Sequence, residues 1–381
     1  MTKWKTYRLG DIATMKYGKL PPKNNSGRYP IWSGYRNVGL TDTYNCGKGT
    51  IIVVARGVGG TGDVKMAKED CFLTNLSIAV NLDVNICNPQ FFYYKFLLSN
   101  LKYLDSGSAQ SQITIDDLKR LQLSLPSLEE QRRIAGILGA IDDKIENNRR
   151  INDNLEKQAQ ALYKQWFVDF NFPNEDGKPY KSSGGKMVDS ELGLIPEGWG
   201  VGTLSDLANV TMGQSPNGKS FNENGEGIVF YQGRTEFGTR YPSIRLYTTE
   251  PTRYAEPMSV LLSVRAPVGD INIATQKCCI GRGVASIKSK TDDNAYMYCC
   301  LKELRPQLDQ YNGEGTVFGS INRKELEGLA LCIPKNEVIN QFNNLVLGMD
   351  RQMLNLFQQT QNLATLRDTL LPKLMNGEIK L

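Results

Sequence analysis

A glycine-rich motif is the first part of the sequence whose residues could do chemistry. Residues 57–62 read Gly-Val-Gly-Gly-Thr-Gly, which fits the G-x-G-x-x-G fingerprint of dinucleotide binding, and Asp83 follows about twenty residues on. A dinucleotide site also needs a helix directly after the glycines. Here residues 63–66 lead into weakly periodic sequence, and the equivalent place in a second copy of this region, residues 265–270, lacks the fingerprint. We therefore interpret the motif as a hairpin or loop.

Two further motifs are similar to catalytic signatures but stand in the wrong context. Residues 88–91 read Asn-Pro-Gln-Phe, close to the Asn-Pro-Pro-Tyr/Phe of amino-methyltransferases, but no glycine-rich loop for a methyl donor precedes them. Asparagine before proline is typical of a helix N-terminus, which is our interpretation. Residues 378–380 read Glu-Ile-Lys, the Glu-x-Lys of metal-dependent nucleases, but those sites need acidic partners on strands. We expect residues 378–380 to be the frayed end of a helix, and we predict no catalytic site in this chain.

The composition also argues against common kinds of catalysis. The 381 residues include no histidine, which removes the commonest general base and most transition-metal sites. The eight cysteines form no CxxC and are interpreted as small buried hydrophobes in a reducing compartment. No apolar run approaches the roughly 20 residues of a membrane span, and the N-terminus is not a signal peptide. We therefore expect a cytoplasmic protein without a metal site.

A long helix is predicted from about Leu128 to Trp166. Apolar residues recur there at alternating steps of four and three, which places them on one stripe at the heptad period. Such a helix is roughly 58 Å long, more than one globular core covers, so it needs a partner helix. The alternative is a lone amphipathic helix lying on a domain. The predicted apolar seam consists of Ile134, Leu138, Ile141, Ile145, Leu155 and Leu162.

The matching stripe lies near the C-terminus of the same chain. Each of its members stands 208 positions after its counterpart in the first helix, so the two helices are predicted to pack against each other. Polar seam positions, Asn148 and Asn152 in one helix and Thr360 and Arg367 in the other, are expected to fix the register at a cost in stability. The apolar members of the second seam are Phe342, Val346, Met349, Met353, Leu363 and Leu370.

The chain as a whole is predicted to be a tandem duplication. Residues 9–13 match residues 204–208, and residues 113–118 match residues 321–326. A period of roughly 200 residues is too long for a solenoid repeat and indicates two copies of a domain-plus-helix unit. The predicted fold class is α+β, with two globular domains separated by an antiparallel two-helix coiled coil and related by a pseudo-two-fold axis. The predicted boundaries are a first domain at 1–125, a central helix at 126–170, a linker at 171–198, a second domain at 199–333 and a C-terminal helix at 334–381.

Basic residues are in excess in one stretch of each predicted domain. Residues 1–65 hold eleven Lys and Arg against three acidic residues, and residues 228–290 hold nine against four, with aromatic residues interleaved in both. Lysine and arginine neutralise phosphates, and arginine, glutamine and asparagine can read base edges. The same excess in both copies, with balanced helices between them, predicts that both domains bind nucleic acid.

Local phrases along nearly the whole chain resemble those of one known family. In the first half they are Leu-Gly-Asp-Ile-Ala at 9–13, Tyr-Pro-Ile-Trp-Ser-Gly at 29–34, Leu-Pro-Ser-Leu-Glu-Glu-Gln-Arg-Arg-Ile-Ala at 125–135 and Trp-Phe-Val-Asp-Phe at 166–170. In the second half they are Gly-Leu-Ile-Pro-Glu-Gly-Trp at 193–199, Leu-Leu-Ser-Val-Arg-Ala-Pro-Val-Gly-Asp at 261–270 and Leu-Pro-Lys-Leu-Met-Asn-Gly-Glu-Ile at 371–379. The chain resembles the specificity subunit of type I restriction–modification systems.

The resemblance implies two target recognition domains, each reading one half of a split double-stranded DNA site. It implies that the long helices are a spacer and a docking platform for methylation subunits. Catalysis would sit in the partners: methylation subunits using S-adenosylmethionine, and restriction subunits using ATP and Mg. No cofactor and no membrane association are expected for this chain. Residues 337–342 lack the Glu-Glu-Gln-Arg-Arg run of the first half, so the two platforms are expected to differ.

The candidate DNA-contacting residues are polar and aromatic side chains near turn-forming glycines. Arg56 and Arg265 occupy related positions in the two copies, so we expect them to contact phosphate or to hold a loop. The candidates in the first domain are Trp32, Tyr35, Arg36, Asn37, Arg56, Gln110 and Gln112. Those in the second domain are Gln232, Arg234, Arg240, Tyr241, Arg245 and Arg265.

Other functions stay open at the level of sequence. A stand-alone DNA methyltransferase would methylate DNA unaided, and a coiled-coil scaffold with incidental basic ends would bind no specific sequence. The chain could also serve a related restriction–modification system that is not of type I, which the neighbouring genes would reveal.

Overall fold

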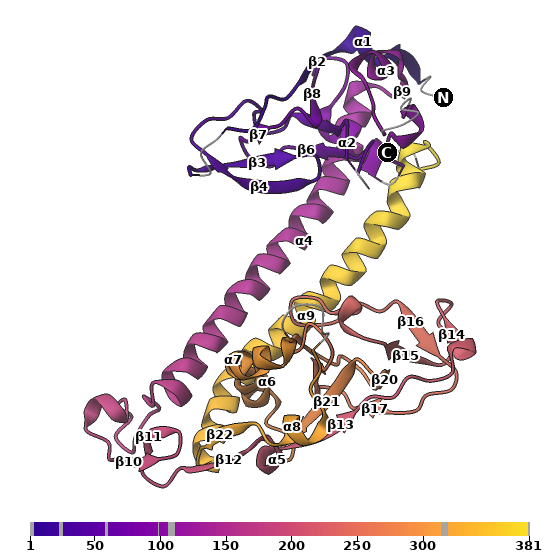
Figure 1. The fold of residues 1–381 in the computed structure, drawn as a ribbon. Coiled ribbons are helices and arrows are strands. Elements are labelled where there is room, and N and C mark those ends of the chain that lie inside the picture. The colour runs from indigo at the N-terminus through magenta and orange to yellow at the C-terminus, as the bar shows by residue number, and fades with distance from the viewer. Residues whose placement is uncertain are drawn as a thin grey trace. The chain divides into compact units, whose positions relative to one another are not determined.

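The computed structural model describes residues 4–22, 26–57, 60–97, 99–105, 111–313 and 319–379. The chain divides into two compact units (Figure 1). Unit 1 comprises residues 1–147 and 360–381, and unit 2 comprises residues 148–359. Each long helix therefore contributes one part to each unit, and each unit has a globular part with its own hydrophobic core.

The globular part of unit 1 combines sheets with short helices. An antiparallel pair joins β1 (Lys5–Arg8) and β9 (Gln122–Leu125). The central sheet has the order β2 (Ala13–Tyr17), β8 (Ser77–Leu82), β5 (Ile51–Val54) and β6 (Val64–Met66). A further sheet has the order β4 (Arg36–Thr41), β3 (Tyr29–Ser33) and β7 (Phe72–Leu73). The helices are α1 (Leu9–Ile12), α2 (Pro89–Leu97) and α3 (Ile115–Arg120).

The globular part of unit 2 is built in the same way. An antiparallel pair joins β12 (Gly200–Thr203) and β22 (Ala330–Ile333), and one sheet has the order β13 (Ala208–Met212), β21 (Val284–Ser289), β18 (Val260–Ser263) and β19 (Ile271–Ile273). A second sheet has the order β14 (Phe221–Asn222), β16 (Leu246–Thr248), β15 (Ile228–Tyr231), β20 (Cys278–Ile280) and β17 (Tyr254–Ala255). The helices are α5 (Leu204–Leu207), α6 (Asn294–Glu303), α7 (Arg305–Asp309) and α8 (Arg323–Glu327).

The two globular parts repeat one topology, which confirms the predicted α+β duplication. The pair β1–β9 corresponds to β12–β22, and the order β2-β8-β5-β6 corresponds to β13-β21-β18-β19. Even the helix caps repeat, because Thr114 with Asp117 forms a capping box at the start of α3 and Asn322 with Glu325 forms one at the start of α8. Each box satisfies backbone groups that a helix start leaves unpaired.

Two of the motifs that resemble catalytic signatures form a helix cap and a turn. Asn88 caps α2, because its side-chain oxygen accepts a hydrogen bond of 2.9 Å from the Phe91 N–H. Of the glycine-rich motif, residues 60–62 form a turn before β6, while residues 58 and 59 lie outside the described residues. The absence of a helix after those glycines removes the geometry that a pyrophosphate needs. Lys380 of the Glu-Ile-Lys motif also lies outside the described residues.

The long helices are α4 (Leu128–Tyr163) and α9 (Asn336–Met375), and they pack against each other within each unit. In unit 1, Asp142 of α4 binds Arg367 of α9 at 2.8 Å. In unit 2, the Asn148 amide donates to the Gln359 side-chain oxygen at 2.7 Å. Residue numbers rise along α4 as they fall along α9, so the helices run antiparallel. The predicted seam residues of both helices are buried or half-buried.

The end of the first long helix and the segment after it differ in detail from the sequence prediction. The α-helix ends at Tyr163, and a π-helical turn, Lys164–Val168, follows it. The stretch expected to be a linker contains a hairpin of β10 (Met187–Ser190) and β11 (Gly193–Pro196). The aromatic ring of Phe172 stacks on Tyr180 and Trp199, with ring centroids 4.7 and 5.0 Å apart. These aromatic contacts order a segment whose Pro, Gly, Lys and Ser content suggested a loop.

Candidate nucleic-acid interface

The candidate residues of unit 1 gather at the tip of the β3–β4 hairpin. Trp32 pairs with Asn37 across the two strands, and Gly34 and Tyr35 form the two-residue turn. Gly34 has φ +59°, a left-handed conformation that glycine adopts without strain at the first central position of such a turn. Tyr35, Arg36 and Asn37 are exposed. The tip therefore presents an aromatic ring, a guanidinium and an amide together, which are groups that contact phosphates and bases.

Lys65 joins this hairpin tip, although the sequence did not single it out from the other basic residues. Its ammonium donates to the Tyr35 carbonyl at 3.1 Å and lies 5.5 Å from the centroid of the Trp32 ring. Burial lowers the pKa of Lys65. The Arg36 guanidinium lies 4.9 Å from the centroid of the Tyr35 ring. Cation–π contacts of this kind hold the basic groups beside the rings.

Arg56 lies next to the same hairpin. A Cβ atom placed on Gly34 would be 3.5 Å from the Arg56 carbonyl oxygen, and Arg56 forms an isolated antiparallel bridge with Gln112. Arg56 is exposed, and within the described part of the chain its side chain forms no ion pair. Gln112 is half-buried, and its backbone N–H donates to Asp105 at 2.8 Å. Gln110 lies outside the described residues.

Arg265 of unit 2 stands in the place that Arg56 occupies in unit 1. It follows β18 as Arg56 follows β5, and it forms an isolated antiparallel bridge with Ser320, which lies 208 positions after Gln112. Arg265 is exposed, and its side chain forms no ion pair with any described residue. The structure thus brings the two related arginines to equivalent, solvent-facing places in the duplicated fold.

Two further polar residues of unit 2 lie near Arg265. The Gly283 N–H donates to the Gln232 carbonyl at 3.3 Å, and the Val264 N–H donates to the Gly283 carbonyl at 3.0 Å. Gln232 and Arg282 are both exposed. Arg282 was not among the predicted site residues, and only its place in a Gly-Arg-Gly turn marked it in the sequence. The backbone segments that carry Gln232, Arg265 and Arg282 thus lie side by side in unit 2.

Arg234 and Arg245 have carboxylate partners within unit 2. Arg234 is ion-paired with Asp270, and Arg245 binds Glu236 at 2.5 Å. The side chains of Arg234 and Arg245 are 48% and 49% exposed, so both arginines remain partly accessible to solvent. A phosphate would have to compete with these carboxylates for the two arginines.

Arg240 and Tyr241 correct the sequence prediction, because both are buried. Arg240 is 6% exposed, and its guanidinium binds Glu156 of α4 and Asp350 of α9. Tyr241 is 4% exposed, and its ring packs against Phe357 with centroids 5.0 Å apart. Neither side chain is exposed on the surface of unit 2. The sequence places Arg240 beside Tyr241. It does not reveal that Glu156 and Asp350, which are distant in the chain, bind the Arg240 guanidinium.

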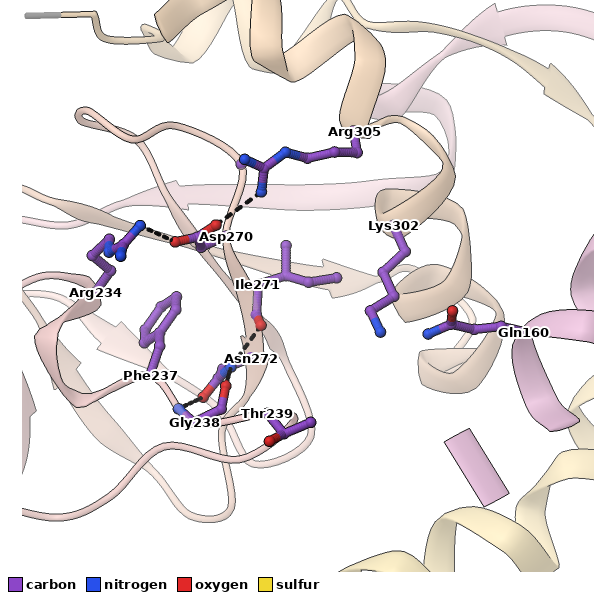
Figure 2. Close-up of a pocket in the computed structure, with 11 residues that line it drawn as sticks. Gln160, Arg234, Phe237, Gly238, Thr239, Asp270, Ile271, Asn272, Lys302 and Arg305 are labelled. Atoms are coloured by element: carbon purple, nitrogen blue, oxygen red, sulfur yellow. Dashed lines mark hydrogen bonds and ion pairs between the residues drawn. The ribbon is translucent and has the colours of Figure 1, made fainter. Parts of the chain in front are cut away.

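A pocket of about 430 Å³ lies in unit 2, between the loop at residues 237–239, the strand β19 and the helix α6 (Figure 2). Its charged side chains are paired with protein groups: Asp270 binds Arg234 and Arg305, and Lys302 binds a carboxylate of α4. The Asn272 amide is bonded to the backbone of Gly238. Because its polar groups already have partners, the pocket offers few free donors to a small ligand.

Metal and membrane features are not found in the residues that the structure describes. No group of three or more Cys, Asp or Glu side chains among them is placed to hold a metal ion. No described helix is long and apolar enough to cross a membrane. All eight cysteines are free and at least partly buried, and burial raises the pKa of Cys278 and Cys299 to about 12. Thiols with raised pKa values are poor nucleophiles at neutral pH.

Comparison with known proteins identifies the family. The sequence model of the family described as "Type I restriction modification DNA specificity domain" matches residues 1–157 and 196–362, once in each half. The chain belongs to this family. Its relatives are named type I restriction enzyme specificity subunits, and this chain is accordingly a non-catalytic DNA-recognition subunit of a type I restriction–modification system.

Individual relatives cover the chain to different extents. The putative type I restriction enzyme MjaX specificity subunit of Methanocaldococcus jannaschii is 38% identical over 65% of this chain and 58% of its own length. The MjaIX specificity subunit of the same organism is 27% identical over 100% of this chain and 89% of its own length. The crystal structure of the type I restriction–modification S subunit from M. genitalium shares the fold, with a TM-score of 0.67 over 98% of this chain and 96% of that one at 20% identity.

Proposed function

We propose that this specificity subunit reads a split double-stranded DNA target, with one half read by the globular part of each unit. The observation that carries the proposal is the equivalence of Arg56 and Arg265. Both arginines are exposed, follow the same strand of the repeated sheet and form the same isolated bridge. A duplicated DNA-contacting surface on one chain suits a target with two parts.

We further propose that α4 and α9 receive methylation and restriction subunits, which perform the chemistry in the cytoplasm. Both helices expose apolar side chains away from their shared seam: Leu345, Leu347 and Leu366 of α9 are 56%, 43% and 47% exposed, and Ile137 of α4 is 39% exposed. A partner that docked on these helices would remove these apolar side chains from water. The methylation subunits would use S-adenosylmethionine, and the restriction subunits would use ATP and Mg.

Exchange of one globular part tests the proposal. Residues 200–330 would be replaced by the corresponding residues of a relative with a different target, and the chimera would be combined with the same methylation subunits. We expect methylation at a target in which one half is new and the other half is unchanged. A change in both halves would contradict separate reading, and methylation by this chain without partners would instead indicate a stand-alone methyltransferase.

A further inference from the structure

Two acidic side chains of the long helices approach a common point in unit 2. Glu156 of α4 and Asp350 of α9 are 8% and 7% exposed, and both bind the same guanidinium. Carboxylates removed from water in this way repel each other unless cations compensate them. The pairing of α4 with α9 in this unit therefore requires positive charge between the helices.

The globular part of unit 2 supplies that charge. Arg240 lies in the loop before β16, and its two terminal nitrogens bind Glu156 and Asp350, the latter at 2.6 Å. Lys302 of α6 binds the second oxygen of Glu156 at 2.7 Å. The Arg240 guanidinium also lies 4.2 Å from the centroid of the Tyr298 ring. Although burial alone would raise it, the pKa of Glu156 is lowered by Arg240 and Lys302, so this carboxylate stays ionised.

In unit 1 the acid at the equivalent position is paired by the facing helix. Asp142 stands 208 positions before Asp350, at the same place in the repeated helix. Its cation is Arg367 of the facing helix, at 2.8 Å. From the globular part, Asp142 accepts a hydrogen bond of 2.7 Å from the neutral Tyr94 hydroxyl. The helix pair of unit 1 thus contains its own ion pair.

Residue types at the equivalent positions explain the difference. The position of Arg367 in the repeat is occupied in α4 by Ala159, and the position of Glu156 is occupied in α9 by Ala364. In unit 2 the facing helix therefore contributes a second acid in place of a base. Among the residues that the structure describes, Arg240 alone binds both Glu156 and Asp350, and it comes from outside the helices.

We call Arg240, Glu156 and Asp350 the clamp. On one side of the clamp, the globular part of unit 2 does not pack closely against the helices. The pocket of about 430 Å³ separates the loop at residues 237–239 from Gln160 of α4 and from Lys302 (Figure 2). Close packing normally fixes how a domain sits on a helix. Elsewhere the globular part shares a hydrophobic core with both long helices, and on this open side the planar fork of Arg240 adds directional ion pairs to each helix.

We propose that Arg240 is a positioning residue that fastens the globular part of unit 2 to both long helices and thereby restricts the gap between the two halves of the DNA target. The inference rests on the proposed function. It assigns Arg240 no contact with DNA. A globular part released from the clamp could tilt on its helices and would accept its half of the target at more than one distance from the other half.

Three variants with one control test this role. Arg240→Met leaves two buried carboxylates without their shared cation, and we expect the Tm to fall by roughly 10 °C or more. The triple variant Glu156→Gln, Arg240→Met and Asp350→Asn removes the charges together and is expected to fold, since neutral replacement of a buried ion cluster is often tolerated. Arg240→Lys retains a cation without the planar fork. The control, Arg323→Met, removes an exposed ion pair of unit 2 and should match the wild type.

The decisive readout is the set of gaps methylated in a DNA library, with each variant supplied with the same methylation subunits. We expect the triple variant to keep the wild-type bases in both halves but to accept gaps one base pair longer or shorter, with discrimination against them reduced about tenfold or more. Arg240→Lys should give the same relaxation to a smaller degree, and it provides the gap readout if the triple variant does not fold.

Three results would overturn the inference: a folded triple variant with the wild-type gap preference, an Arg240→Lys protein that keeps that preference when the triple variant is unfolded, or an Arg240→Met protein as stable as the control. Altered base preference in one half would instead indicate that Arg240 reads DNA. The proposed function is tested separately by the wild-type protein. If the wild type directs methylation to no split motif, the proposed function is contradicted before any variant is compared.

Discussion

The partners of each arginine decide which of them are free to meet a phosphate. Arg56 and Arg265 are exposed and make no ion pair with described residues, Arg234 and Arg245 share their charge with carboxylates, and Arg240 is buried. In water the charge of an exposed guanidinium is available to a polyanion, whereas a paired guanidinium first has to leave its partner. The partners of the arginines therefore distinguish candidate DNA contacts better than the spacing of the arginines in the sequence does.

Alanine in place of Arg56 or Arg265 should weaken DNA binding about equally for all sequences. Each arginine is expected to neutralise one phosphate, so the slope of log K against log salt should fall by about one per substitution. The measurement is a salt titration of binding by the subunit with its methylation subunits. Arg323→Ala is the control, since that arginine is paired with Glu327 within α8. A slope equal to that of the wild type in both variants would remove the two arginines from the interface.

Alanine in place of Arg36 should act on sequence preference. Arg36 stands at the exposed tip of the β3–β4 hairpin, and a bidentate contact to a base is worth roughly 1–3 kcal/mol. Arg234→Ala should have a smaller effect, because Asp270 holds that guanidinium. Binding to the preferred target and to targets with single base changes measures both. Unchanged affinity and unchanged preference in the two variants would refute these assignments.

At the scale of elements, both units combine apolar packing and ion pairs at the two long helices, but in unit 2 the cation comes from the globular part. In unit 1, Ile134 and Leu138 of α4 share a core cluster with Leu371 and Leu374 of α9. In unit 2 the helices also share a buried charge cluster with the globular part. Charge compensation in a buried place depends on protonation, so the stability of unit 2 should respond to acid.

Acid should destabilise unit 2 through Glu156. Its pKa is lowered from an ordinary value of 4.5 by Arg240 and Lys302, which outweigh the opposing effect of burial. A carboxyl group whose pKa is lower in the folded protein stabilises the fold at pH values above its ordinary pKa. This stabilisation is lost as the pH falls through the pKa that the group has in the folded protein. Burial raises the pKa of Asp350, so its contribution has the opposite sign.

The free energy of unfolding should therefore fall below about pH 4.5 in the wild type. The loss should be less steep in Glu156→Gln, which has no carboxyl to protonate. Denaturant unfolding at several pH values measures both slopes. Equal slopes in the two proteins would show that Glu156 is not held by its cations.

The sequence predicted the elements better than their contacts. Alternating steps of four and three predicted the seam of α4 and α9, because a helical stripe depends only on local spacing. The β3–β4 hairpin was not predicted as such, although the candidate residues beside it were chosen for their place near turn-forming glycines. The clamp could not be predicted from the sequence. Arg240 is 84 and 110 positions away from Glu156 and Asp350 in the chain, and no periodicity links such residues. Residue type alone therefore suggested a DNA contact at Arg240, a residue that the structure buries between the two helices.

At the scale of the whole molecule, the duplication and the long helices together suggest how a gap is measured. We propose that helix length sets the distance between the two half-sites. Asn148 and Leu356 stand at the same place in the repeated helices, 208 positions apart. Inserting one heptad after each preserves both apolar stripes and lengthens each helix by roughly 10 Å, about three base pairs of DNA.

The double insertion should therefore lengthen the preferred gap. Insertion in one helix alone should unfold the pair, because its seam would face an unmatched partner. Methylation mapping of the folded double-insertion protein with unchanged methylation subunits gives the gap. If that protein keeps the wild-type gap, the helices do not set the spacing.

The most direct test of the account is a base-resolution methylation map of a random DNA library treated with this subunit and its methylation subunits. The account predicts one split motif, with two fixed half-sites separated by a gap of fixed length, and no methylation when this subunit is left out. A continuous motif, or the same methylation without this subunit, would contradict the claim that its two globular parts read the target.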